Sequence, residues 1–371
     1  MHFIPSSGSR LHLSAPVETQ NDTVSLSFNY FFYFSFCFCF PTADEVEGMA
    51  VRNETRVTQF ILLGFSSNPD LQIVLFVFFL VMYLGTIAGN LLIMITIYVD
   101  SQLHSPMYFF LSNLSFIDVF FSTVTIPRAL VNFLSPSKAI SFRDCIAQLF
   151  FLHFIGGTEC LHLSLMAYDR YVAICHPLRY TTIMNPRACL LLVVSTWTLG
   201  LIHAFAQVFP TIHMPFCGPN KIDHFFCETH ALYLLVCSSS LFIEIVDMVN
   251  SGFLTLSCCL VVFISYTYII STVLKIRSAE GRQKAFSTCA SHVLVVTIHF
   301  GSSVFIYLRP SVTFAADKPL SVFYAIVTPF LNPFIYTLRN KEVKKAMKKL
   351  GGSVFSKDTQ KLKRNHLAVT D

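Results

Sequence analysis

Seven long apolar stretches, separated by short polar segments, dominate the pattern of hydrophobic and polar positions along the chain. The first, Leu71 to Val99, contains no charged residue over its whole length. About 20 apolar residues are enough for a helix to cross the hydrocarbon core of a bilayer, so this stretch predicts a tilted transmembrane helix. The other six predicted spans cover about 105–127, 145–168, 188–211, 244–272, 285–308 and 320–338. The pattern therefore predicts an all-α, polytopic membrane protein with a bundle of seven transmembrane helices.

Composition agrees with a bilayer as the solvent. Of the 371 residues, 54% are hydrophobic and 13% are charged, and the mean hydropathy is +0.60. A soluble domain carries charge on about a quarter of its residues, so this chain has too few charges for a soluble surface. Seven spans with short loops use roughly 300 residues as one bundle, in place of the two soluble domains that length alone would suggest.

The segments on either side of the bundle complete the domain prediction. Leu26 to Pro41 is rich in phenylalanine, is too short for a comfortable span, and has the character of a signal h-region. Because Met49 begins a segment that can serve as a full N-terminus, we expect the preceding residues to have no role in the fold. The predicted domains are a disordered or signal-like N-terminal extension at 1–48, an extracellular N-terminus at 49–70, the seven-helix domain at 71–338 and a cytoplasmic tail at 339–371.

The tail begins with a basic segment. Between Lys341 and Lys349, lysines alternate with apolar residues at helical spacing. This pattern predicts a short amphipathic C-terminal helix that lies on the anionic inner leaflet.

Charge placement predicts the orientation. With the N-terminus outside, the segments that face the cytoplasm hold more than twice as many lysines and arginines as the opposite loops. A glycosylation sequon at Asn53 agrees, because acceptor asparagines face the lumen. A second sequon, at Asn21, lies in the extension, and a third, at Asn113, lies inside the second span and should be unusable. We therefore predict a plasma-membrane protein with an extracellular N-terminus and a cytoplasmic C-terminus.

Four of the twelve cysteines fall on the predicted outer side: Cys145, Cys217, Cys227 and Cys237. An even number of cysteines in an oxidising compartment predicts two disulfides. Four cysteines allow three pairings, and their spacing does not choose among them.

Two carboxylates and two amides lie within the predicted spans. Asp118 is in the second span and Glu159 in the third, with Asn90 and Asn332 at comparable depths in the first and seventh. A charged group at mid-membrane costs ~2.5–3.5 kcal/mol on insertion scales, so it needs a partner or a function. If the carboxylates converge, either one takes up a proton or a cation binds between them, and oxygen ligands suit a hard cation. The alternative is a neutral hydrogen-bonded network that joins the helices.

Four motifs read MAYDRYVAICHPL at 166–178, PMYFFLSNLS at 106–115, KAFSTCASH at 284–292 and PFLNPFIY at 329–336. These motifs resemble those of odorant receptors, a family of rhodopsin-like G-protein-coupled receptors. The resemblance runs from about 49 to 350, in the order and spacing of the family. It implies binding of small volatile ligands, activation of a stimulatory olfactory-type heterotrimeric G protein, and a rise in cyclic AMP.

The resemblance implies that Asp169, Arg170 and Tyr171 form a switch at the cytoplasmic end of the third helix. In this switch, an ionic pair with a neighbouring residue holds Arg170 until activation frees it to contact the G protein. The alternative is an ordinary arginine that snorkels at a helix end.

The seventh helix carries a second implied switch element. Asn332, Pro333 and Tyr336 form either a movable hinge or a static kink, and Asn332 is well placed to satisfy a carbonyl that the proline frees. Related rhodopsin-like receptors hold a sodium ion in this region that favours the inactive state. Asp118, Glu159 and Asn332 are therefore the candidate ligands of a sodium site.

Two features that the sequence lacks help to define the ligand. The seventh span has no lysine for a retinal Schiff base, and Leu152 stands where amine receptors place an aspartate. The outer halves of the third, fifth, sixth and seventh helices are largely apolar, which favours a small, uncharged, mostly apolar ligand held by one or two hydrogen bonds. Helix position indicates His153, Gly156, Phe300 and Tyr324 as pocket candidates, although His153 has an alternative role in packing.

One motif departs from the family. The usual Phe-Tyr-Gly step of the sixth helix reads His299-Phe300-Gly301 here, which removes a hydroxyl donor at the floor of the expected pocket. At the outer end of the fifth span, Glu244 and Asp247 are expected to face water near a helix start.

Other functional classes fit less well. A transporter would usually show inverted repeats or paired broken helices, and the sequence has no internal repeat. No HExxH or GxSxG motif is present, so we expect no enzyme activity and no catalytic residue. The expected partners are a small odorant, a heterotrimeric G protein and the lipid bilayer, with no nucleic acid and no cofactor beyond a structural sodium ion. The sequence carries no signal for the oligomeric state, and a non-olfactory ligand stays an alternative.

Overall fold

The computed structural model describes residues 57–66, 68–216, 220–237, 241–307, 317–340 and 342–350. All of them belong to one unit, Asp44–Asp371. The predicted extension at 1–48, the sequon at Asn53, Cys217 and the tail beyond 350 lie outside the described residues.

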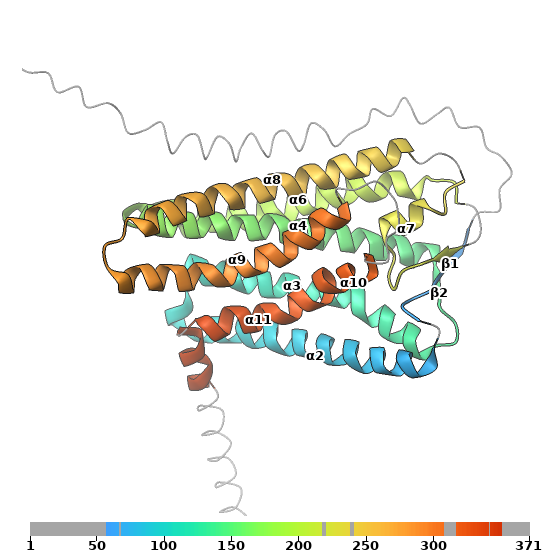
Figure 1. Cartoon of the computed structure of the whole chain (residues 1–371), viewed down its shortest axis with the longest axis horizontal. Helices are drawn as coiled ribbons and strands as arrows, with labels where there is room; N and C mark the ends of the chain where they lie inside the picture. The colour runs from blue at the N-terminus through green and yellow to red at the C-terminus, as the bar shows by residue number, and fades with distance from the viewer. Residues whose placement is uncertain are drawn as a thin grey trace, which may run out of the picture. The chain divides into compact units, whose positions relative to one another are not determined.

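Within the described residues, seven helices are long and apolar enough to cross a membrane (Figure 1). They are α2 (Pro69–Val99), α3 (Pro106–Leu134), α4 (Phe142–Cys175), α6 (Pro186–Ile212), α8 (Leu241–Leu274), α9 (Ala279–Tyr307), and a seventh built from α10 (Asp317–Val322), η4 (Phe323–Val327) and α11 (Thr328–Arg339). Short helices η2 (Ser101–Leu103), η3 (Pro177–Arg179), α5 (Tyr180–Ile183) and α7 (Thr229–Tyr233) lie in the connections. The prediction of a seven-helix membrane bundle is confirmed.

Local sequence signals set the helix starts. Asn68 caps α2 by accepting a hydrogen bond from the Asp70 amide at 2.9 Å, and Asn185 caps α6 by accepting one from the Ala188 amide at 3.0 Å. A proline occupies the first turn of both helices. The helices are longer than the apolar blocks, and α4 and α8 reach 34 residues each. The excess arises because helical backbone continues past the apolar stretch into polar turns.

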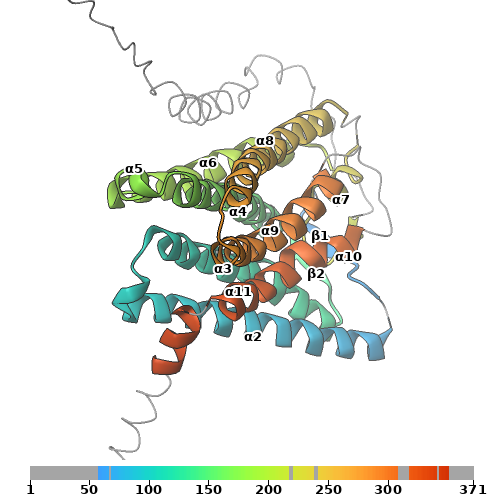
Figure 2. The same ribbon diagram turned by 60° about the vertical axis from the view of Figure 1, so that its left-hand side comes forward.

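Helix α4 is at the centre of the bundle. It packs against α3, α6, α8 and α9, and Figures 1 and 2 both place it among them. In its most apolar 18-residue window, 78% of the residues are buried, against 17% for α2. The exposed side chains of α2 include Val77, Val81 and Leu84, which suit contact with lipid. Side chains of α4 therefore have the best position to link the two ends of the bundle.

The seventh helix changes geometry along its length. Its middle part, η4, is a π-helix, a form that occurs often at functional sites. Pro329 and Pro333 follow in α11, and neither has an amide hydrogen to donate. The Asn90 side chain, from α2, donates to the Pro329 carbonyl at 3.2 Å. A side chain from another helix therefore satisfies backbone at this irregular segment, as membrane helices with prolines require.

A small sheet covers the end of the bundle that we predict to face outward. The strands β1 (Gln59–Leu62), β2 (Ala139–Ser141) and β3 (Lys221–Ile222) lie in the order β2-β1-β3, with β1 antiparallel to β2 and parallel to β3. Phe60 and Leu62 of β1 are fully buried in an apolar cluster with residues from the outer ends of α4 and α6. The N-terminal segment is thus part of the folded cap, which the sequence did not predict.

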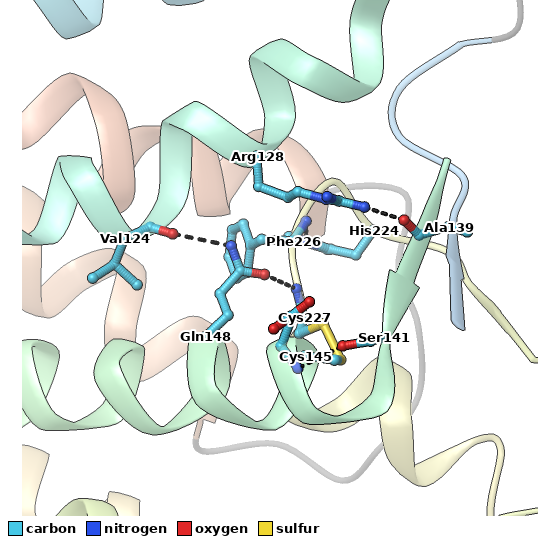
Figure 3. The surroundings of a disulfide bond; sticks show 10 residues. Val124, Arg128, Ala139, Ser141, Cys145, Gln148, His224, Phe226 and Cys227 are labelled. Carbon is cyan, nitrogen blue, oxygen red and sulfur yellow. Dashed lines mark hydrogen bonds between the residues drawn. A yellow bond between two sulfur atoms is a disulfide. The ribbon is translucent and has the colours of Figure 1, made fainter. Parts of the chain in front are cut away.

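A disulfide joins this cap to α4. Cys145 and Cys227 are bonded with their Cα atoms 5.5 Å apart, across 82 residues of chain (Figure 3). Beside the bond, Gln148 accepts a hydrogen bond from the Cys227 amide and donates one to the Val124 carbonyl, each at 3.0 Å. Cys237 is also disulfide-bonded, which agrees with the prediction of outer disulfides.

The C-terminal amphipathic helix is present over 342–350. Asn340 accepts hydrogen bonds from the first amides of this helix, and the Tyr108 hydroxyl donates to Glu342 Oε2 at 2.7 Å. Val343 and Ala346 are buried, whereas the four described lysines of the helix are exposed. The apolar and basic faces are therefore arranged as the sequence predicted.

Candidate functional site

A cavity of about 40 Å³ lies inside the bundle, which is space for a few water molecules. It is lined by Phe121, Leu152, His153, Gly156, Gly157, Cys160, His203, Ser251, Leu254, Thr255, His299, Ser303 and Tyr324. Three of the four predicted pocket residues, His153, Gly156 and Tyr324, are among them. The fourth, Phe300, is buried but does not line the cavity, and its neighbour His299 does.

The surface of the cavity wall is mostly apolar, and polar side chains also reach it. Three imidazoles reach it from three helices: His153 from α4, His203 from α6 and His299 from α9. Hydroxyl groups from α8, α9 and the seventh helix add further donors and acceptors. Helical periodicity marks which face of a helix points inward, but it does not show that the polar positions of several helices meet at one depth. A ligand that fits this wall needs hydrogen-bonding groups as well as apolar surface.

The outer loop supplies a roof to this region. Thr229, in α7, lies 2.8 Å from His153 Nε2 through its hydroxyl oxygen. Two residues earlier, Cys227 is fixed to α4 by its disulfide with Cys145. The covalent bond therefore determines where Thr229 can lie. Thr229 was not among the predicted pocket residues. The one feature of the sequence that could have indicated it is its position two residues after Cys227.

Side chains in the first turns of α8 point into the bundle interior. Gln207 of α6 donates from its amide to the Asp247 carbonyl at 3.4 Å and to the Ser251 hydroxyl. The Asp247 side chain is only 3% exposed, so the prediction that it faces water is wrong. The reason is that α6 covers this turn of α8, a contact that charge near a helix start does not reveal. The side chain of Glu244 lies outside the described residues.

An imidazole and a thiol line one end of the cavity, and a carboxylate lies behind the imidazole. Nδ1 of His299 lies 3.1 Å from Glu159 Oε1, and Nε2 of the same ring lies 3.2 Å from Cys160 Sγ. All three side chains are at least nine-tenths buried. Neither oxygen of Glu159 has a well-directed hydrogen bond among the described residues. The His299 ring therefore lies between Glu159 and Cys160, at contact distance from both.

The second buried carboxylate has a different partner. Nδ2 of Asn332 donates to both oxygens of Asp118, at 3.0 Å each, and joins α11 to α3. The prediction that Asn332 satisfies a carbonyl freed by the proline is not supported, because its amide hydrogens are directed at Asp118. Asp118 and Glu159 are close enough for their charges to repel. The structure therefore brings the three predicted sodium-site residues into one region but gives the two carboxylates separate partners.

Several oxygens in this region fit a hard cation. Ser122 Oγ, Asn332 Oδ1 and both oxygens of Glu159 are buried without a hydrogen-bond partner among the described residues. Such oxygens are the donors that sodium and other hard cations use. In the same part of the chain, no three His, Cys, Asp or Glu side chains form a site of the kind that transition metals prefer.

The predicted switch residues lie near the C-terminal end of α4, the end that we predict to face the cytoplasm. Asp169 accepts a hydrogen bond from the Tyr180 hydroxyl at 2.9 Å, and the Tyr171 hydroxyl lies 3.0 Å from His176 Nε2. Burial, and next the charge of Asp169, raise the pKa of Tyr180, so its phenol stays protonated and can donate. Arg170 is buried at the same level.

Helices α8, α9 and α11 complete this end of the bundle. The Tyr266 hydroxyl of α8 lies 2.8 Å from His292 Nδ1 of α9, and Ser291 of α9 donates to the Ile335 carbonyl of α11 at 3.2 Å. Tyr336, the predicted hinge tyrosine, is buried, and its hydroxyl has no hydrogen-bond partner among the residues that the structure describes. An unsatisfied buried hydroxyl is costly, so this group gains from any rearrangement that brings it a partner.

Known proteins similar to this chain cover most of its length. The family model described as "Olfactory receptor" matches residues 79–352. Human olfactory receptor 10G7 is 50% identical over 306 residues, which make up 82% of this chain and 98% of that receptor. Mouse olfactory receptor 4E2 is 51% identical over 302 residues, or 81% of this chain and 98% of that receptor. Human olfactory receptor 4Q2 is 51% identical over 302 residues, or 81% of this chain and 95% of that receptor.

Proposed function

Because the chain belongs to the olfactory receptor family, we propose that it binds small, mostly uncharged volatile molecules and activates a stimulatory olfactory-type heterotrimeric G protein. Activation would raise cyclic AMP. The proposal that the chain binds a ligand rests on the cavity inside the bundle, next to the contact between His153 and Thr229. This cavity lies between α3, α4, α6, α8, α9 and η4. Family membership and the seven apolar helices establish a multi-pass membrane receptor that is not an enzyme.

The cavity dimensions support a small ligand. Small ligands gain at most ~1.5 kcal/mol per heavy atom and usually much less, so we expect an affinity in the micromolar range. Signalling requires only that the ligand bind the active arrangement more tightly than the inactive one.

The proposed transduction element is the cytoplasmic end of the bundle. Arg170 acts as the switch residue with Asp169 and Tyr171 beside it, and Asn332, Pro333 and Tyr336 act as a hinge. Support comes from the π-helical η4 directly before the two prolines, and from the buried Tyr336 hydroxyl described above. Rearrangement of the seventh helix can satisfy that hydroxyl while it changes the surroundings of Arg170.

A sodium ion is the proposed structural cation between Asp118, Glu159 and Asn332. Its support is the group of buried oxygens that lack hydrogen-bond partners in this region. The ion would supply positive charge between two carboxylates in a low-dielectric setting, and loss of the ion would favour the active arrangement.

The proposed orientation has the N-terminus outside and the C-terminus in the cytoplasm, at the plasma membrane. The disulfide at the Cys145 end of α4 and the exposed lysines at the end of the described chain support this orientation. Epitope tags at the two ends of the chain, stained on intact and on permeabilised cells, test it. Detection of both tags on intact cells would contradict it.

A cyclic-AMP reporter screen against a panel of volatile compounds tests the proposed function. Two versions of the receptor, one started at Met1 and one at Met49, should be screened in parallel with surface staining. Equal responses would support an extension at 1–48 without a role in the fold. Arg170→Ala is the signalling control. We expect it to reach the surface and to lose the response. Normal signalling by Arg170→Ala at normal surface level would contradict the proposed switch.

A further inference from the structure

The inner end of the cavity holds an arrangement that ligand binding alone does not require. Cys160, His299 and Glu159 form a line in which the imidazole lies between the thiol and the carboxylate, at 3.2 Å and 3.1 Å respectively. Glu159 and Cys160 are neighbours on α4, and His299 comes from α9. In this order, a base contacts the nucleophile and an anion contacts the base, which is how proteins activate a cysteine.

Access to a ligand distinguishes this thiol from the others. The free cysteines in the described part of the chain are Cys160, Cys175, Cys189, Cys258, Cys259 and Cys289. Of these six, only Cys160 lines the cavity, and His299 lines it too. A molecule in the cavity therefore contacts the thiol and its base together.

We propose that Cys160 forms a covalent thioether with α,β-unsaturated aldehydes and ketones that enter the cavity. This inference rests on the proposed function as a receptor for small ligands, and it names one chemical class among them. Such compounds are soft electrophiles, and the cysteine thiol is the softest nucleophile in the cavity wall.

The reaction is a conjugate addition that needs no oxidant or reductant. The Cys160 S–H bond breaks and its proton moves to His299 Nε2, while sulfur forms a bond to the β-carbon. The C=C π bond breaks, its electrons pass through the carbonyl group as an enolate, and the α-carbon then takes the proton from His299. Glu159 stabilises the imidazolium during the transfer. Every atom of thiol and ligand is retained in the product.

The surroundings suit the carbonyl group of such a ligand. The Ser251 and Thr255 hydroxyls lie in the same wall and offer donors for the enolate oxygen as charge develops on it. Burial disfavours a free, charged thiolate, so the thiol has to keep its proton until it reacts. The base therefore has to take the proton as the S–C bond forms.

Mass spectrometry of the full-length receptor in cell membranes tests the proposal. The probe is trans-2-hexenal, and hexanal, which has the same chain without the C=C bond, is its matched control. Borohydride reduction after exposure fixes the adduct. We expect one hexenal on the peptide that carries Cys160, none from hexanal, and none in Cys160→Ser. Cys259→Ser, a half-buried thiol outside the cavity, is the matched cysteine control and should leave the labelling of Cys160 unchanged.

His299→Phe tests the role of the base. A positioned base contributes about 100-fold or more to such a step, so labelling of Cys160 should slow by about 100-fold in surface-displayed His299→Phe. Phenylalanine is the residue that the family usually places at this step, so the variant should still fold. If His299→Phe is absent from the surface, His299→Asn is measured in its place. Equal labelling rates with and without the imidazole would overturn the assigned role of His299.

The signalling readout separates this proposal from the proposed function. We expect the cyclic-AMP response to hexenal to persist after washout in the wild type and to reverse in Cys160→Ser. A receptor that responds to other volatiles while hexenal leaves Cys160 unmodified overturns the covalent site and keeps the proposed function. An adduct at Cys160 with no cyclic-AMP response to any volatile keeps the covalent site and overturns the proposed function.

Discussion

Gly156→Ala tests whether the cavity determines which ligands the receptor accepts. Gly156 lines the cavity, and a Cβ atom added there would have only Phe121 within 4 Å, at an ordinary contact distance of 3.7 Å. The new methyl group therefore occupies cavity space without displacing the fold. One methylene in a hydrophobic pocket is worth about 1–3 kcal/mol, or 10- to 200-fold. We expect the half-maximal concentration for a ligand that fills the wild-type cavity to rise by that factor, and a shorter homologue to recover most of the loss.

The assay is the cyclic-AMP response to a homologous series of aldehydes or alcohols, normalised to surface staining. Gly301→Ala is the matched control, because its added Cβ would have nothing within 4 Å, and it should behave like the wild type. Gly200→Ala is the opposite control. Its Cβ would lie 2.9 Å from the Phe154 carbonyl oxygen, a backbone atom of α4, so this variant should lose surface display. Unchanged ligand-length dependence in well-displayed Gly156→Ala would refute the assignment of the cavity as the ligand site.

Three further predictions concern other parts of the molecule. Sodium should lower agonist affinity in the wild type and have no effect in Asp118→Asn, and a sodium effect that survives the substitution would rule out the proposed ion. Tyr180→Phe leaves the buried Asp169 without the phenol donor, which costs about 1–3 kcal/mol of stabilisation. Basal cyclic AMP should therefore rise several-fold, and unchanged basal activity would contradict this role of Tyr180. Burial lowers the pKa of His224 to about 4, below its ordinary value of 6.5, so between these values only the unfolded loop takes up the proton. The outer cap should therefore lose about 3 kcal/mol of stability as pH falls from 6.5 to 4. The rate of proteolysis of the loop as a function of pH measures this loss of stability. The same pH profile in His224→Phe would show that His224 is not the group responsible.

The sequence predicted the elements of this fold well, because a bilayer imposes a simple rule on a spanning helix. An uninterrupted apolar block such as Leu71 to Val99 has few alternatives to a helix in lipid, and the observed α2 begins only two residues earlier. The same rule says nothing about the outer cap. Strand β1 has only four residues, and its pairing with two loops depends on contacts distant in sequence. The cap therefore had no local signal.

The sequence predicted which residues belong to the candidate site better than it predicted their contacts with one another. Asp118, Glu159 and Asn332 were expected together because charge in a membrane needs compensation. The sequence did not reveal that Glu159 would face His299. That residue was noted only for the hydroxyl missing beside it, since the partner of a side chain on another helix depends on how both helices are rotated. Asp247 was misjudged for a related reason, because exposure at a helix end depends on what covers that end.

The proposed ligand cavity and the proposed switch share one helix, which limits how a signal could pass between them. His153 and Arg170 are 17 residues apart on α4, which corresponds to about 25 Å along the helix axis. No proline interrupts α4 between them, and this stretch is one continuous α-helix. The seventh helix, in contrast, has a π-helical segment and Pro333 between the cavity residue Tyr324 and the buried Tyr336. We infer that α4 acts as the fixed element and that the seventh helix moves against it, because irregular helices absorb displacement at a lower energetic cost than regular ones.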